Sequence, residues 1–153
     1  MRSRAIERLG CALSSRPEEA LPVHEANLAL LRRYWPHDEE NILVAQCNLA
    51  SCLQAPGRRD EALVLQREIY NGFVATFGIS HENTVINGIN LAVSLNQQGF
   101  CEECRTLLHD QLLPAARRSQ GADSDSTLTL NSILALNLLY NPEHTRDDLL
   151  EAE

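Results

Sequence analysis

Cys101 and Cys104 form the one compact thiol motif of this sequence, and two glutamates separate them. Thiols at this spacing act in redox reactions when a helix N-terminus or a nearby cation stabilises the thiolate. A thioredoxin-like motif should follow a strand, whereas this one follows a helical pattern that ends at Gly99. We therefore expect a packing role for Cys104, with a thiol redox protein acting through both cysteines as a minor alternative.

No other arrangement of residues points to reaction chemistry. The histidines are scattered and no second cysteine pair stands at zinc spacing, so we expect no metal ion. The sequence also has no glycine-rich phosphate loop, no nucleophile elbow and no pair of carboxylates suited to acid–base work. We therefore expect no cofactor, no catalytic residue and no enzymatic activity.

The composition restricts the class of partner. The formal charge of −8 disfavours nucleic acid and anionic membrane surfaces, which bind through clustered cations. No run of about eighteen apolar residues is present to span a membrane, and the first residues are too charged for the core of a signal peptide. Five cysteines without a secretion signal indicate free thiols in a reducing compartment, so we expect a cytoplasmic protein.

The chain repeats itself with a period of 42 residues. Asn48-Leu49-Ala50 recurs as Asn90-Leu91-Ala92, and Glu61-Ala62 lies 42 residues after Glu19-Ala20 and 42 before Glu103-Cys104. A fixed period of this size indicates a stack of helical units, each of which buries its apolar face against its neighbours. Such a chain presents an extended surface, and binding is its expected role.

Apolar residues at helical spacing predict a series of helices, and glycine or proline follows most of them. No stretch alternates with period two, so we expect no strand. We expect a single domain of four units, 1–36, 37–79, 80–122 and 123–153, of which the first and last are incomplete. The predicted helices cover residues 17–34, 39–54, 58–78, 81–99, 101–118 and 126–140, with short helical segments at 1–13 and 146–150.

Two sets of small residues recur in register. Ala20, Ala62 and Cys104 share one position of the repeat, and small side chains there let paired helices approach closely. Ala50, Ala92 and Ala135 are predicted to share a second position of this kind.

These residues resemble the tetratricopeptide (TPR) repeats of the kinesin light chain type, whose units run to about 42 residues. The resemblance rests on His81-Glu82-Asn83-Thr84, Asn90-Leu91-Ala92, Gly99 and Glu102-Glu103, with a similar pattern in the preceding unit, and covers about residues 17 to 140. It implies an all-α fold, a right-handed superhelical solenoid of antiparallel helix pairs with about three repeats.

The resemblance also implies a binding groove lined by the first helix of each unit. In this family an asparagine before the Leu-Ala pair hydrogen-bonds the backbone of an extended peptide, and Asn48 and Asn90 match it. The equivalent residue in the last unit is Ile133, which interrupts the series. Alternatively, the asparagines bond loop backbone or a neighbouring repeat, and the apolar positions are core. The other expected groove residues are Val44, Ser51, Ile86, Val93 and Gln97, with Cys47, Gln54 and Ile89 beside them.

We therefore expect a non-catalytic scaffold that binds a peptide segment or a partner protein in this groove. The predicted first helices contain neither lysine nor arginine, which argues against the subtype that grips a terminal carboxylate. The alternative is a self-associating structural repeat, or a fragment of a larger array, because incomplete end units would expose apolar surface.

Overall fold

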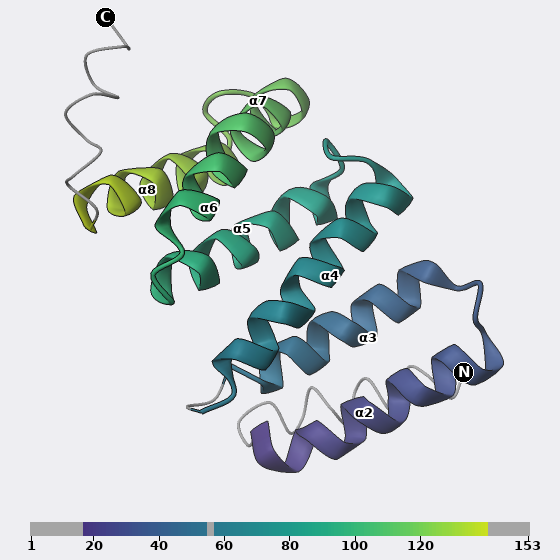
Figure 1. Ribbon diagram of the computed structural model, residues 1–153. Coiled ribbons are helices and arrows are strands. Elements are labelled where there is room, and N and C mark those ends of the chain that lie inside the picture. Colours follow the sequence, from purple (N-terminus) through teal and green to yellow (C-terminus); the bar gives the residue numbers. More distant parts are fainter. Residues whose placement is uncertain (1–16, 55–56, 141–153) are drawn as a thin grey trace, which may run out of the picture. The chain divides into compact units, whose positions relative to one another are not determined.

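The computed structural model describes residues 17–54 and 57–140. Within these ranges every regular element is helical, which confirms the predicted all-α class (Figure 1). The helical segments predicted at 1–13 and 146–150 lie outside the described residues. The elements are α2 (Pro17–Tyr34), α3 (Glu39–Cys52), α4 (Arg59–Phe77), α5 (Glu82–Gln97), α6 (Cys101–Thr106), the π-helix η1 (Leu107–Leu112), α7 (Leu113–Gln120) and α8 (Asp125–Tyr140).

The chain divides into two compact units, Met1–Thr76 and Phe77–Glu153. In the first unit α2, α3 and α4 follow one another in antiparallel order (Figure 1). The α2–α3 contact is built on Leu28, Leu31 and Ala45, against which Ile42 and Leu49 pack. Helix α4 approaches α3 closely at Gly72. A Cβ added to this glycine would lie 2.5 Å from Cδ2 of Leu43, a buried residue of α3.

In the second unit α5 packs against α6, η1 and α8, and α7 also packs against α8. The core includes Leu95 of α5, Leu108 and Leu112 of η1, and Leu130 of α8, which are all fully buried. The burial of large aliphatic side chains is the main stabilising contribution to such a core. It fixes α5 and α8 relative to each other within this unit.

Helices α3, α5 and α8 each start at a side-chain cap. Asp38, His81 and Ser124 each accept a hydrogen bond from a backbone N–H two or three residues later, at 3.2–3.3 Å. Such caps satisfy N–H groups that have no partner inside the helix. After α5 ends, Gly99 adopts a left-handed conformation with a φ of 82°, which glycine reaches without strain. The helix boundaries therefore lie close to the predicted ones.

The predicted single helix 101–118 is wrong in its interior, because residues 107–112 form a π-helix. Pro114 explains the change. It has no N–H to donate to the carbonyl of Asp110, and its ring excludes that carbonyl from the usual position. A wider turn before the proline accommodates the ring, and the chain then continues as α7 to Gln120.

The first set of small residues lies as predicted. Ala20, Ala62 and Cys104 are all fully buried, which confirms that this repeat position is a close helix contact. The second set is only partly correct. Ala50 and Ala92 are buried, but Ala135 is exposed, so its assignment to the same position is wrong.

Candidate protein-binding surface

Three predicted groove residues lie on one face of α3, in the first unit. Val44, Asn48 and Ser51 are spaced four and three residues apart, which places them on one side of a helix. Val44 and Ser51 are exposed and Asn48 is half-buried. The Ser51 hydroxyl donates to the carbonyl of Cys47 at 3.0 Å, so its hydrogen is used within the helix.

The other four predicted residues form a stripe on α5, in the second unit. Ile86, Asn90 and Gln97 are exposed, Ile86 at 43%, and Val93 is half-buried. The carboxamides of Asn90 and Gln97 form no hydrogen bond to the described part of the chain. These two amides are therefore available to an external partner, on a helix whose other face is buried. The structure brings these four residues together, and places the three of α3 in a separate unit.

A third stripe on α8 was missed by the sequence reasoning. Leu128, Ser132, Ala135 and Leu139 lie 42 residues after the four stripe residues of α5, and all four are exposed. Leu128 is 51% exposed and Leu139 is 75% exposed. Because α5 packs against α8, the two stripes belong to neighbouring helices of one unit.

The burial pattern of α8 corrects the register of the last repeat. Its buried residues are Thr127, Leu130, Ile133 and Asn137, and each lies 42 residues after a buried residue of α5. Ile133 is therefore core and not the counterpart of Asn90, which is Ser132. The strict 42-residue period indicates this register. The alignment of Ala135 with Ala92, which are 43 residues apart, led instead to a register shifted by one residue.

Asn137 connects α8 to the rest of the unit. Its side-chain N–H group donates to Asn96 Oδ1 at 3.0 Å and to the carbonyl oxygen of Cys101 at 3.1 Å. Asn137 is fully buried, at a repeat position that Leu95 occupies in α5. One carboxamide thus joins α8 to the end of α5 and to the start of α6.

The surface formed by the α5 and α8 stripes carries no charge. In α5 the one charged residue is Glu82, and in α8 it is Asp125, both in the first turn, where a carboxylate favours the positive helix end. Ionic recognition of a partner is thus not what these two helices offer. At the stripe positions they offer apolar side chains and, on α5, amides.

Cys104, the second residue of the thiol pair, has the properties of a packing residue. Cys104 is fully buried, and its thiol donates to the carbonyl of Ala92 at 3.3 Å. Burial, with a smaller effect of nearby Cys101, raises the pKa of the Cys104 thiol to about 11. A reactive cysteine requires a lowered pKa and access to solvent, so the structure gives the redox alternative no support.

The histidines of the described ranges do not gather at a site. Within the described residues no group of three or more His, Cys, Asp or Glu side chains could hold a metal ion. His24 is buried, and burial lowers its pKa. His37, His81 and His109 are exposed, and His144 lies outside the described residues. None of the described helices is long and apolar enough to cross a membrane.

Comparison with protein-family models gives no match, and no curated protein matches the chain. Solved structures do match. A kinesin light chain protein of Podosopora anserina with nearly identical TPR-like repeats superposes with a TM-score of 0.79 at 22% sequence identity, over 99% of this chain and 72% of that one. A single-substitution variant of that protein matches with a TM-score of 0.80 over the same shares. The predicted fold is therefore confirmed: this chain has the TPR-like helical-repeat fold found in kinesin light chain-like proteins.

Proposed function

We propose that this chain is a non-catalytic protein-interaction module that binds an extended segment of a partner protein along the stripe of α5. TPR-like repeats generally serve as scaffolds for protein interactions, and their stacked helices present extended binding surfaces. The free thiols of Cys47, Cys52, Cys101 and Cys104 fit a cytoplasmic setting, where thiols stay reduced.

The observation that carries the proposal is the pair of unused amides on α5. A carboxamide offers both a donor and an acceptor, so it can bond the N–H and C=O of an extended peptide at the same time. Asn90 and Gln97 lie seven residues apart, two helical turns or about 10 Å along the axis. Ile86 and Val93 alternate with them and would contact the side chains of the bound segment.

The stripe of α3 is proposed as a second contact surface of the same kind. Asn48 occupies the position that Asn90 has in α5, and its side chain forms no hydrogen bond to the described residues. Val44 precedes it by one turn, as Ile86 precedes Asn90. Ser51 is less suited to bind a peptide than the other two residues of this stripe, because its hydroxyl already donates within its helix.

The test is affinity capture from a lysate, followed by measurement of the affinity for the retained protein. Variant Asn90→Ala/Gln97→Ala should lose at least one hydrogen bond at each amide, worth about 0.5–1.5 kcal/mol each, which corresponds to binding weakened by at least about 5- to 150-fold. Asn71→Ala is the matched control, since it removes an exposed amide of α4. Asn48→Ala asks separately whether α3 contributes. If the double variant binds the captured protein as tightly as the control does, the amides of α5 are not the binding groups.

A further inference from the structure

Helix α8 is apolar on both of its faces. Its inner face supplies Leu130 and Ile133 to the core, yet Leu128, Leu136 and Leu139 on the outer side are 51%, 47% and 75% exposed. A helix that is hydrophobic all round is normally buried. The outer face of α8 therefore has the character of an interface.

The outer face of α8 differs from that of α5 in its hydrogen-bonding capacity. Where α5 has Asn90 and Gln97, α8 has Ser132 and Leu139. The Ser132 hydroxyl donates to the carbonyl of Leu128 at 2.9 Å, so its hydrogen is used inside the helix. The four stripe positions of α8 offer no amide to a peptide backbone, and the stripe is suited to contact with another apolar helix.

The exposed stripe of α8 is symmetric along the helix. Leu128, Ser132, Ala135 and Leu139 are spaced by four, three and four residues, so the order is the same read from either end. In an antiparallel pair of identical helices, Leu128 would meet Leu139 of the second copy, and Ser132 would meet Ala135 of the second copy. A two-fold interface requires this self-complementarity, and the small central residues allow the two helices to approach closely.

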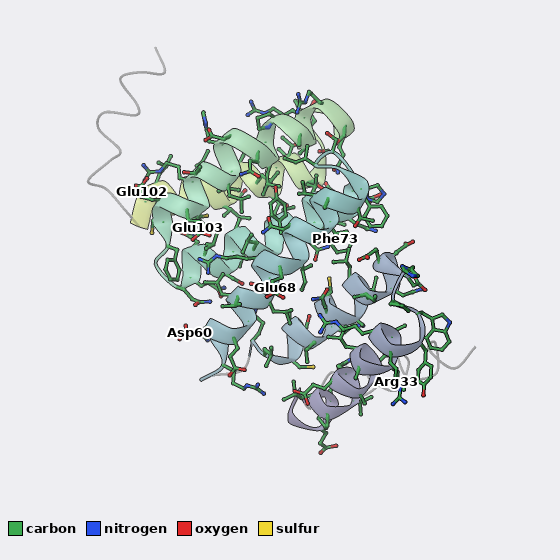
Figure 2. All side chains as sticks on the ribbon, turned by 45° about the vertical axis from the view of Figure 1, so that its right-hand side comes forward. Arg33, Asp60, Glu68, Phe73, Glu102 and Glu103 are labelled. Carbon is green, nitrogen blue, oxygen red and sulfur yellow. The ribbon has the colours of Figure 1, made fainter. Side chains whose placement is uncertain are left out.

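Charge also favours this face for self-pairing. Two copies that each carry −8 repel wherever acidic side chains meet. Carboxylates project from several other helices, as Figure 2 shows for Asp60 and Glu68 of α4 and for Glu102 and Glu103 of α6. The stripe of α8 carries none over its whole length, so two copies can meet there without juxtaposed charges.

We propose that a second copy of this chain covers the outer face of α8, through an antiparallel α8–α8 pair about a two-fold axis. The stripe spans eleven residue steps, about 16 Å of helix. A contact of this length buries less area than the standard interface, which covers about 800 Å² per partner. The dimer therefore forms reversibly, and its population depends on protein concentration. The proposal is separate from the peptide-binding role, which uses the amides of α5.

The test is sedimentation equilibrium of the full chain over a series of protein concentrations. The parent should rise from monomer toward dimer mass as concentration increases. Leu128→Glu and Leu139→Glu should each remain monomeric, because each places a carboxylate against a leucine of the second copy. The matched control is Val64→Glu on α4, where the side chain is 56% exposed, and it should dimerise like the parent. Circular dichroism verifies that each variant is folded.

A charge-pairing experiment tests the antiparallel arrangement. A mixture of Leu128→Glu and Leu139→Lys chains should form a heterodimer, because the new carboxylate and ammonium groups face each other. A mixture of Leu128→Glu and Leu128→Lys chains should stay monomeric. A parent that is monomeric at every concentration overturns the proposal, as do dimers that tolerate both leucine substitutions or that are rescued by the 128–128 mixture. Asn90→Ala should dimerise normally, which separates this result from failure of the peptide-binding role.

Discussion

Replacing Asn137 with alanine should loosen α8 from the second unit. The substitution removes both hydrogen bonds of the side chain, to Asn96 Oδ1 at 3.0 Å and to the Cys101 carbonyl at 3.1 Å. A neutral bond of this kind contributes about 0.5–1.5 kcal/mol, so the two together should lower the free energy of unfolding by about 1–3 kcal/mol. That is a large part of the stability of a typical domain.

The matched control is Asn90→Ala on α5. Both substitutions place alanine in a helix and gain the same helix propensity, up to about 0.7 kcal/mol. Asn90 is exposed and its side chain forms no hydrogen bond to the described residues, so the difference between the two variants measures the contacts of Asn137. Urea unfolding followed by circular dichroism gives both free energies, and an unchanged slope shows that the same surface is exposed.

Asn137→Leu sharpens the test. Leu95 occupies the equivalent position of α5, so a leucine side chain suits this part of the repeat. It restores apolar packing but no hydrogen bond, and its stability should lie between the parent and Asn137→Ala. If Asn137→Ala is no more destabilising than Asn90→Ala, the reasoning is refuted, because the two bonds then contribute nothing to the attachment of α8.

Two further predictions concern the small-residue positions. Ala92→Leu should lower the free energy of unfolding by about 1–3 kcal/mol through overpacking. Ala135→Leu, on the exposed stripe, should stay within about 0.5 kcal/mol of the parent. Equal losses of the two variants in urea unfolding would contradict the corrected register. Burial raises the pKa of Cys104 from 9.0 to about 11, so the folded state holds this proton more tightly than the unfolded state does. Its contribution is complete below pH 9 and should be lost as the pH rises toward 11, and Cys104→Ala should show a smaller decline in unfolding free energy over that range.

The fold was largely predictable because the repeat and the helix signals agree with one another. Asp38 and His81 stand before apolar residues at helical spacing, Gly78 follows α4 and Gly99 follows α5, so local signals mark several of the helix ends. The small residues at 20, 62 and 104 then show which faces meet. Each of these signals comes from residues close together in the chain, which is where sequence patterns are strongest.

The features that were not predicted depend on contacts between distant residues or on backbone sterics. Asn137 stands where the repeat favours leucine, and its burial follows from partners that lie 36 and 41 residues earlier in the chain. The π-helix has a local cause, Pro114, whose effect is felt at the carbonyl four residues before it. The periodicity of residues 101–118 continues through it, so the pattern of apolar residues does not reveal the wider turn.

The α8 stripe shows why a predicted fold is more robust than a predicted site. A shift of one residue in the repeat alignment leaves α8 a helix with the same bounds, but it rotates every assignment by about 100°. The 43-residue alignment therefore put a core residue, Ile133, on the binding face, and put an exposed one, Ala135, in a buried contact. Burial determines the register because it can be compared along the whole helix. Four buried residues of α8 match buried residues of α5 at a spacing of 42, whereas a single alanine matched at a spacing of 43. In a helical repeat, the assignment of binding-site residues is thus only as accurate as the alignment of the repeats. One matched residue is too little to determine that alignment.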